Sequence, residues 1–317
     1  MHIKKIVSDI TILFTGYNIK PFAVLAIESF LLHNPNMRKN IIYFDDESTD
    51  GTKEELQSRG IKVITWLPNI KEKYNNYEQN IRVGDYGHFE RACLAQRVSF
   101  ILYCAAMQIK TTYLYVSDAD MVFFDDNYFL YAVEDFAKNN CIISGSSSII
   151  PIRNDSSERC TEYMKTLQSE DFLLQSITYD RLQYLTTKAY PNQMLMELRA
   201  LKNLGVVFDG INNLHIYDDT GCEFYRQLMC HNIPIREIIK YMDIMDATDS
   251  PWFLHLRWVS SIYRMAKYDF GEYEEFMMDL FEKRLLGDKR VEDICDKLSL
   301  DIRAMYQEYI NNIYASK

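Results

Sequence analysis

The sequence predicts an α/β fold, with a mostly parallel, doubly wound sheet and a helical C-terminal extension. Over residues 1–125, short apolar segments alternate with longer segments of helical spacing. Strands that are separated by helices pair in parallel, because each crossover returns the chain to the same end of the sheet. After residue 260 the pattern is helical to the end. With 317 residues, 48% of them hydrophobic, the chain is long enough to bury a full core.

The first half contains the clearest elements. Strands are expected at Ile10–Phe14, Ile41–Phe44 and Ile61–Trp66, and helices at Pro21–Leu32, Thr52–Ser58 and Phe89–Met107. Pro21 falls in the first turn of its helix, where its missing N–H would have no intrahelical partner. The polar segment 68–87, rich in asparagine and tyrosine, is expected to be a loop. The last helix of this half leads to a further apolar strand at Tyr113–Phe124.

The second half is less regular. The elements expected here are helices at Tyr128–Lys138 and Glu223–Met229, a strand at Cys141–Ser144, and a mixture with helical spacing over 160–184. Val206 begins a strand-like segment that ends in acidic residues. We expect one domain over residues 1–260, in two halves divided near residue 125, and a helical extension over 261–317. Gly271 and Gly287 are expected to break the helices of that extension.

Composition argues against several classes of protein. The formal net charge is −10 and the pI about 5.2, which predicts no nucleic-acid partner and no electrostatic attraction to an anionic membrane. The seven cysteines are scattered without a C-x-x-C pair, so we expect reduced thiols. No apolar run reaches the roughly 20 residues that cross a bilayer, and the start of the chain reads as a first strand, not as a secretory signal. We therefore expect a cytoplasmic protein without a transmembrane segment, which leaves peripheral contact with the inner face of the membrane open.

Within the segment Tyr113–Phe124, YLYVSDADMVFF, two aspartates are separated by one residue. Side chains two apart on an extended strand point the same way, so Asp118 and Asp120 are expected to present their carboxylates together where the strand leaves the sheet. Ligands of open α/β sheets bind beyond the carboxyl ends of the strands. Two hard oxygen ligands at that edge suit Mg²⁺ or Mn²⁺, and such an ion can bridge to a diphosphate.

A second polar segment, DDESTDGT at Asp45–Thr52, follows the apolar strand Ile41–Phe44. A carboxylate at the end of a strand can accept hydrogen bonds from a nucleobase, and Ser, Thr and Gly build the tight turn into the next helix. A calcium-loop interpretation of the same segment fails, because Gln57 stands where an EF-hand loop needs a bidentate glutamate. The first strand ends in a comparable way, with TGYN at Thr15–Asn18.

These three motifs, in this order, resemble the nucleotide-sugar glycosyltransferases of the GT-A fold, most closely those of family two. That family opens with an apolar strand and T/S-x-Y/N, here TGYN, continues with D-D-x-S-x-D-x-T, here DDESTDGT, and after a long helix reaches D-x-D, here DAD. The resemblance covers Ile10–Phe124. It implies that residues 1–125 bind the nucleotide sugar and residues 126–260 the acceptor. The residues that it assigns to the donor are Thr15, Tyr17, Asn18, Asp46, Asp118 and Ala119.

The resemblance extends to an acidic pair in the second half. Family-two enzymes often carry F-D-x, then E-D, then a helix with D-L-x-x-R-L. Here Phe208–Gly210 is followed by Tyr217–Asp219 and Glu223–Leu228, with Arg226 displaced by one residue from the arginine of the motif. Asp218 stands in place of the glutamate. The family role of the pair's aspartate, which takes the proton from the acceptor hydroxyl, would fall on Asp219, with Asp218 as the close alternative. The structural alternative is an acidic helix start that interacts favourably with the helix dipole.

Further residues complete the site that the resemblance implies. Many GT-A enzymes recruit a late histidine to the metal, and His255 in SPWFLHLRW stands in that place, with Arg257 expected to face the diphosphate. Imidazole is an acceptable ligand of Mn²⁺. Arg91 and Arg97 lie on the long helix before D-x-D, where relatives place residues that contact the nucleotide. A histidine in an apolar strand and arginines on a helix are also common as purely structural residues.

The resemblance implies a metal-dependent glycosyltransferase of the hexosyltransferase type. It would move a sugar from a nucleoside diphosphate, UDP by preference, to a hydroxyl of a glycan or lipid-linked acceptor in bacterial surface polysaccharide synthesis. Mn²⁺ or Mg²⁺ on Asp118, Asp120 and His255 is the expected cofactor. Asp219 as general base implies inversion of the anomeric centre, and a retaining GT-A enzyme is the first alternative. From other classes, SDADMV matches the nucleophile motif of haloacid-dehalogenase-like phosphatases, and a non-enzymatic scaffold is the last alternative.

Overall fold

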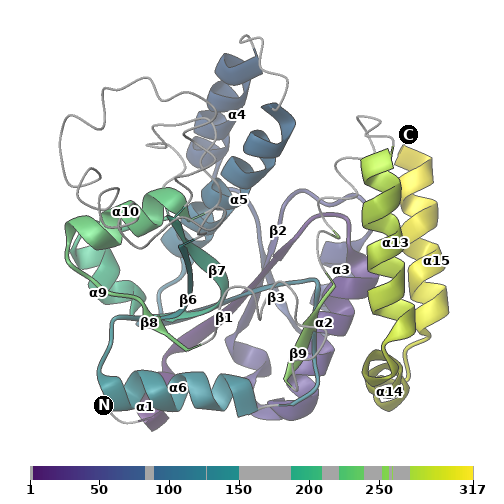
Figure 1. Cartoon of the computed structure of the whole chain (residues 1–317), viewed down its shortest axis with the longest axis horizontal. Helices are drawn as coiled ribbons and strands as arrows, with labels where there is room; N and C mark the ends of the chain where they lie inside the picture. Colours follow the sequence, from purple (N-terminus) through teal and green to yellow (C-terminus); the bar gives the residue numbers. More distant parts are fainter. Residues whose placement is uncertain are drawn as a thin grey trace. The chain divides into compact units, whose positions relative to one another are not determined.

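A computed structural model of the chain forms two compact units that are interleaved along the sequence. It describes residues 3–82, 89–125, 127–149, 187–208, 221–238, 252–256, 259 and 272–316. The first unit comprises residues 1–65, 114–138 and 242–317, and the second comprises residues 66–113 and 139–241. Each unit is described by itself below, with the element labels of Figure 1. The domain boundaries expected near residues 125 and 260 stay a prediction.

The first unit is built on parallel strands. In their order across the sheet, these strands are β3 (Lys62–Ile64), β2 (Ile41–Asp45), β1 (Ile10–Gly16) and β4 (Tyr113–Asp118). β1, β2 and β3 run in parallel, and the register places Gly16 beside Asp45, so that β1 and β2 end at the same edge. Nearly every residue of β1, β2 and β4 is buried, as expected for a sheet covered on both faces. The predicted α/β class with a mostly parallel sheet is confirmed.

Aromatic packing fills the core of this unit. Its helices before residue 140 are α1 (Ile3–Ser8), α2 (Lys20–His33), the 3₁₀ helix η1 (Pro35–Asn40), α3 (Thr52–Ser58) and α6 (Asn127–Asn139). Phe30 of α2 meets the rings of Phe14, Phe123 and Phe129 edge to face, at centroid distances of 6.1, 5.4 and 5.3 Å. Ser29 of α2 accepts a hydrogen bond from the amide of Phe123 over 3.1 Å. α2 therefore fixes the strand that follows the D-x-D segment.

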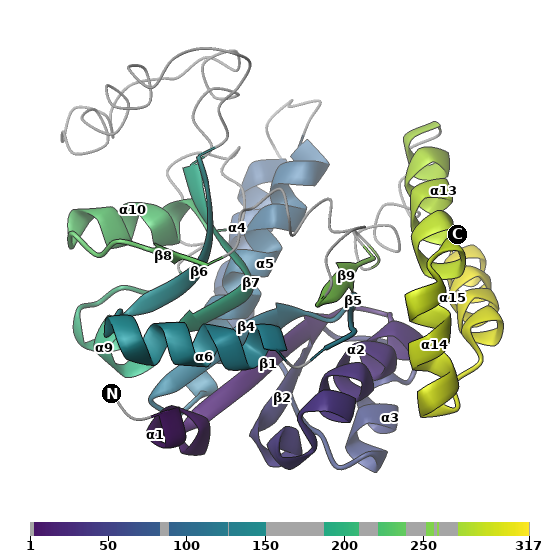
Figure 2. The ribbon, with the colours of Figure 1, turned by 60° about the horizontal axis from the view of Figure 1, so that its bottom comes forward.

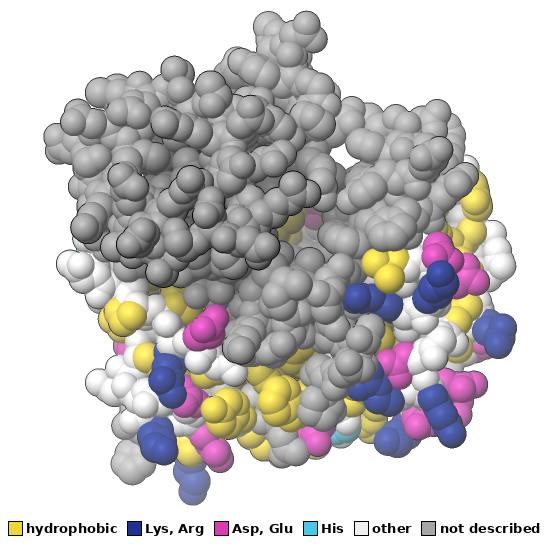
Figure 3. Space-filling model, viewed as in Figure 1, with side chains coloured by type: hydrophobic (Ala, Val, Ile, Leu, Met, Phe, Trp, Pro, Cys, Tyr) yellow, Lys and Arg dark blue, Asp and Glu magenta, His cyan; other side chains and the backbone are white. Residues whose placement is uncertain are grey.

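Chain segments far apart in sequence complete the first unit. They are the strand β5 (Met121–Phe123), the strand β9 (Phe253–His255), and the helices α13 (Glu272–Gly287), α14 (Lys289–Leu298) and α15 (Ile302–Ser316). β5 and β9 pair antiparallel, and Figure 2 shows the green arrow of β9 next to the teal β5, close to α2. Phe22 of α2 packs edge to face on Phe281 and on Tyr309, at 5.1 Å each. The outer surface of these helices carries interspersed basic and acidic side chains (Figure 3). The predicted helical C-terminal region is confirmed, and α13 ends at Gly287 as expected.

The second unit is organised around an antiparallel strand pair. Its elements are α4 (Pro68–Arg82), α5 (Phe89–Gln108), β6 (Ile143–Ile149), β7 (Thr187–Met196), α9 (Leu198–Asn203), α10 (Cys222–Cys230) and β8 (Arg236–Glu237). β6 lies between β7, to which it is antiparallel, and β8, to which it is parallel. Trp66 stacks on Tyr74 of α4 at 5.6 Å, and Tyr74 meets Phe100 of α5 at 5.3 Å. These rings join the two helices.

Several sequence expectations were wrong. Residues 68–82 form α4 instead of a loop, because Ile70 and Tyr74, one helical turn apart, bury their side chains although the rest of the segment is polar. Ile3–Ser8 forms a helix instead of joining the first strand, and buries Ile6. β7 was not expected, and Pro191 within it obscures the strand pattern.

Two expectations concern less regular parts of the chain. Val206 begins no strand, since residues 206–208 have no regular secondary structure. The helical mixture over 160–184 and the break at Gly271 lie outside the described residues. In the part of the chain that the structure describes, no helix has both the length and the apolar character that a membrane crossing requires.

Candidate metal centre

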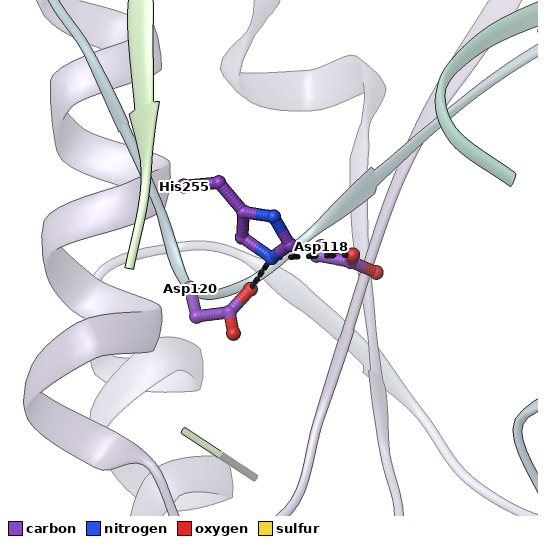
Figure 4. Close-up of side chains that lie close together, drawn as sticks. All are labelled: Asp118, Asp120 and His255. Carbon is purple, nitrogen blue, oxygen red and sulfur yellow. Dashed lines mark ion pairs between the residues drawn. The ribbon is translucent and has the colours of Figure 1, made fainter. Parts of the chain in front are cut away.

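The D-x-D segment leaves the sheet in a turn. β4 ends at Asp118, Ala119 and Asp120 form the turn, and β5 begins at Met121. The expectation that the period of an extended strand would align the two carboxylates was therefore wrong. The turn brings both of them to one histidine instead (Figure 4).

His255 reaches this turn from a distant part of the sequence. It ends β9, where the strand pairing places it opposite Met121, the residue after Asp120. The amide of Leu256 donates to the carbonyl of Asp120 over 2.8 Å and extends the ladder beyond His255. The imidazole then points at the two carboxylates, as Figure 4 shows. The backbone of β5 and β9 thus fixes where all three side chains meet.

The three side chains offer ligand atoms at distances that suit a divalent ion. Nε2 of His255 lies 3.2 Å from Oδ1 of Asp120 and 3.8 Å from Oδ2 of Asp118, and the three ligand atoms all lie within 4.8 Å of one another. An octahedral ion with bonds of about 2.1 Å holds neighbouring ligand atoms about 3 Å apart and opposite ones about 4.2 Å apart. Two carboxylate oxygens and one imidazole nitrogen form a donor set that Mn²⁺ accepts.

Burial is uneven across the centre. The side chain of His255 is 5% exposed and that of Asp120 is 11% exposed, whereas that of Asp118 is 31% exposed. Two of the ligand candidates are therefore shielded by the fold, and Asp118 lies on the side from which solvent or a ligand can approach. Among the described residues, Nδ1 of His255 has no hydrogen-bond partner, although it is buried. The ring orientation is thus not fixed through that nitrogen by any described residue.

Asp120 is ionised at neutral pH in this setting. Burial opposes its ionisation, but the charge and hydrogen bond of His255 and the amide of Val259 outweigh that effect, so the pKa of Asp120 lies below its ordinary value. The Val259 amide donates to Oδ2 of Asp120 over 3.3 Å, which leaves Oδ1 directed at His255. A carboxylate in its charged form is the state that a metal ligand needs.

The predicted nucleotide-binding residues of β1 and β2 lie at the ends of those strands. Asn18 is buried and closes one loop on the other: its amide donates to Oγ of Ser48 over 3.0 Å, and its Oδ1 accepts from the amide of Thr49 over 2.6 Å. Asp46 is fully buried, and its amide donates to the carbonyl of Gly16 over 3.2 Å. Thr15 and Tyr17 are partly exposed. The structure thus places these residues at one sheet edge, where the hydrogen bonds of Asn18 hold the loop after β1 against the loop after β2.

Backbone conformation explains two residues of these loops. Asn18 has a φ of +51°, a region that asparagine tolerates better than most residues. Gly16 cannot carry a side chain, because a Cβ there would overlap the hydroxyl of Tyr43 and the side chain of Ile19. The glycine and the asparagine of TGYN are therefore required by the fold itself, independently of any contact with a ligand.

Asp45 is a buried acid that the sequence analysis did not single out. It ends β2 and is 4% exposed; Oδ2 accepts from the amide of Ser48 over 3.2 Å, while Oδ1 has no hydrogen-bond partner among the described residues. Burial raises the pKa of Asp45, and the hydrogen bonds from Ser48 offset only part of that rise. The doubled aspartate of DDESTDGT was the signal that marked this position.

The remaining predicted residues are not brought to the centre by any described contact. Arg97 lies over the rings of Trp66 and Tyr74, with its guanidinium carbon 5.6 and 5.0 Å from the ring centroids, in a cation–π arrangement within the second unit. Arg91 is part of α5, but its side chain lies outside the described residues, as do Asp218, Asp219 and Arg257 entirely. Their predicted roles stay predictions.

Comparison with known proteins finds similarity only among solved structures. No family model and no curated protein matches the chain. S. aureus TarS, residues 1–349, is 12% identical over 97% of this chain and 80% of that chain, with a TM-score of 0.41. The mannosyltransferase PcManGT from Pyrobaculum calidifontis, in complex with GDP-Man and Mn²⁺, is 11% identical over 97% and 74%, with a TM-score of 0.44.

A third solved structure covers less of the chain. Glucosyl-3-phosphoglycerate synthase from Mycobacterium tuberculosis, in complex with Mn²⁺, UDP and glucosyl-3-phosphoglycerate, is 13% identical over 63% of this chain and 62% of that chain, with a TM-score of 0.34. These scores describe a limited overlap of the backbones, and by themselves they assign no activity to this chain.

Proposed function

We propose that this chain is a metal-dependent glycosyltransferase that moves a sugar from a nucleoside diphosphate to an acceptor hydroxyl. The observation that carries the proposal is the meeting of Asp118, Asp120 and His255, with three ligand atoms within 4.8 Å of one another. The order of TGYN, DDESTDGT and DAD along the strands of the first unit supports the same conclusion. Paired acids alone occur in many proteins, but here a buried imidazole joins them from another strand.

The centre is suited to hold Mn²⁺ or Mg²⁺ against a diphosphate. When bound, the ion would neutralise the negative charge that builds up on the departing nucleoside diphosphate. Asp120, ionised and shielded, and His255 would hold the ion from the protein side. Asp118, the most exposed of the three, would stand nearest to the phosphates.

The donor is expected to be a UDP-sugar. Thr15 and Tyr17, which are partly exposed at the shared edge where β1 and β2 end, would contact its nucleoside. Asp46 lies at the same edge but is fully buried, so no contact with the nucleoside is proposed for it. TarS has been solved in complex with UDP-GlcNAc, and PcManGT with GDP-Man, so both nucleotides need to be tested. Arg91 and Arg97 keep their proposed roles toward the diphosphate or base only if they contact the donor once it is bound.

The acceptor side of the proposal rests on the sequence. Asp219, or Asp218 in its place, would take the proton from a hydroxyl of a glycan or lipid-linked acceptor, and the product would have an inverted anomeric centre. A retaining reaction would need no such base, and NMR of the product's anomeric configuration distinguishes the two outcomes. Synthesis of bacterial surface polysaccharide on the cytoplasmic side is the proposed setting.

Metal-dependent nucleotide binding tests the proposal. Calorimetric titration of UDP and GDP with and without Mn²⁺ is expected to show binding that requires the metal in the wild type and is lost in Asp120→Asn. Asp279→Asn is the matched control, since Asp279 is an exposed acid on α13 paired with Lys283. Nucleotide binding without metal, or binding retained in Asp120→Asn, would contradict the proposal. Phosphate release from a simple phosphomonoester would favour the phosphatase alternative instead.

A further inference from the structure

We infer that the C-terminal helices position the ligand atoms of the metal centre, with Arg284 of α13 and Tyr309 of α15 as the positioning residues. This inference rests on the proposed function of that centre. Neither residue is expected to touch the ion or the donor. Arg284 acts instead through the backbone of His255, and Tyr309 through the backbone of Val259, which bonds to the carboxylate of Asp120.

Arg284 holds the segment that carries the histidine. Its Nη1 donates to the backbone carbonyl of His255 over 2.7 Å, and the residue is only 7% exposed. A metal-bound histidine is usually oriented by a hydrogen bond from its second ring nitrogen. No described residue provides that bond to Nδ1 of His255. The main-chain position of His255 contributes to where Nε2 points, and Arg284 restrains that main chain directly.

Tyr309 restrains the second ligand through one intermediate residue. Its buried hydroxyl donates to the carbonyl of Val259 over 2.5 Å, and the amide of the same Val259 donates to Oδ2 of Asp120 over 3.3 Å. With Oδ2 held by Val259, Oδ1 of Asp120 faces His255 at 3.2 Å. Loss of the Tyr309 hydroxyl would release Val259, and with it the carboxylate orientation.

The helices that supply these two residues are themselves fixed to the rest of the unit. Phe281 and Tyr309 pack edge to face on each other at 5.4 Å, and both pack on Phe22 of α2. Arg290 of α14 lies over the ring of Phe124, just after β5, at 4.4 Å. Apolar and aromatic contacts of this kind are sufficient to dock a helix pair.

The guanidinium of Arg284 and the hydroxyl of Tyr309 are thus not needed for docking. Burying a guanidinium is unfavourable unless it is well hydrogen-bonded, and a buried tyrosine hydroxyl likewise needs a partner. Here a buried group from each of two helices donates to the backbone around the ligands, Arg284 to His255 and Tyr309 to Val259. Both bonds end within four residues of each other, next to the carboxylates. Because both hydrogen bonds end in this segment, Arg284 and Tyr309 are placed to fix the geometry of the metal centre.

Two variants with matched controls test the inference. Tyr309→Phe removes only the hydroxyl, and Arg284→Met keeps most of the side-chain volume. Tyr306→Phe is the control for Tyr309→Phe, because the Tyr306 hydroxyl bonds to the exposed Glu282 on the same pair of helices. Arg303→Met, at an exposed position of α15, is the control for Arg284→Met. We expect the affinity for Mn²⁺, measured by electron paramagnetic resonance of the free ion, to fall about 10- to 100-fold in the two variants and to stay unchanged in the controls.

The outcomes separate this inference from the proposed function. If the wild type binds Mn²⁺ and His255→Ala does not, but Tyr309→Phe and Arg284→Met bind as the wild type does, the positioning role is overturned and the metal centre stands. If the wild type binds no Mn²⁺, the proposed function is overturned. The positioning role is then decided by the ¹H–¹³C NMR signal of the His255 ring, measured in the metal-free protein. A changed signal in the two variants but not in the controls supports it, and an unchanged signal overturns it.

Discussion

The first unit contains two polar clusters, and they use their side chains differently. In the loop pair, Thr15–Asn18 and Asp45–Thr52, side-chain oxygens such as those of Asn18 and Asp50 bond to amides and hydroxyls of neighbouring residues. In the metal centre, Asp118, Asp120 and His255 converge on one another. The side-chain oxygens of Asn18 and Asp50 are satisfied by the fold, and of the first cluster's acids Asp45 keeps one buried oxygen without a partner among the described residues. The second cluster gathers two acids that a cation would stabilise further.

This difference distinguishes a polar turn, whose side chains stabilise the fold, from a candidate metal site. Two carboxylates close together oppose each other's ionisation, and a nearby positive charge relieves that repulsion. In the loop pair, the side-chain oxygens of Asn18 and Asp50 already face donors of the protein, so these two residues need no added group. A count of acidic residues would favour the loop pair as the site, since DDESTDGT holds more acids than DAD. The direction in which the side chains point distinguishes them.

The largest effect is expected from removing both carboxylates of the metal centre. Asp118→Ala combined with Asp120→Ala should lower kcat/KM for sugar transfer by about 10⁴-fold, because charge stabilisation by a metal amounts to several kcal/mol. Steady-state kinetics at saturating Mn²⁺ measure it. A loss below tenfold would show that the centre does not serve the reaction.

The next effect concerns a residue outside both clusters. Asp219→Asn is expected to lower turnover by ~10²–10⁴-fold while the affinity for the nucleotide stays near that of the wild type, because a general base acts only in the chemical step. Rapid-quench kinetics together with nucleotide titration separate the two quantities. Wild-type turnover in this variant would remove Asp219 from the role, and Asp218→Asn would then be tested in the same way.

A substitution in the loop pair should lower the stability of the protein and leave its affinity for Mn²⁺ unchanged. Asp50 accepts from the amides of Lys20 and Thr52 over 2.9 and 3.0 Å and from the hydroxyl of Thr52, so Asp50→Ala leaves three donors without this partner. We expect the free energy of unfolding to fall by about 1–3 kcal/mol, measured by urea denaturation, with unchanged affinity for Mn²⁺. Glu54→Ala, an exposed acid in the next helix, is the control. A change in Mn²⁺ affinity would show that the two clusters are coupled.

The smallest effect is a pH dependence within the loop pair. Because burial raises the pKa of Asp45 above its ordinary value near 3.8, its contribution to stability is fully present below that value and is lost as pH rises through the folded-state pKa. Asp45→Asn does not titrate. Its free energy of unfolding, relative to the wild type, should therefore increase from pH 4 upward. Urea denaturation at stepped pH measures this difference, and a constant difference would contradict the assignment.

Much of the fold could be predicted from local sequence patterns. β1, β2, α2 and α3 follow from apolar runs and turn residues that lie next to each other in the chain. The helix α4 could not be predicted, because two buried side chains in a polar segment determine it. The turn at Ala119 and Asp120 was hidden for a related reason: the flanking residues read as one strand, and only the pairing of β5 with β9 shows where it divides.

The site could be predicted only in part. Asp118 and Asp120 are visible as a motif, and His255 by resemblance. The restraint of these residues by Arg284 and Tyr309 leaves no pattern in the sequence, since it depends on how distant helices pack. Asp218 and Asp219 lie outside the described residues and stay predictions.

The interleaving of the first unit has a consequence for how the protein is made. A ribosome releases the strand with Asp118 and Asp120 long before it synthesises β9 and the helices α13–α15. A nascent chain therefore carries the two acids without the histidine that completes the set. Cation capture, and any chemistry that depends on it, is deferred until the later segments have emerged and docked.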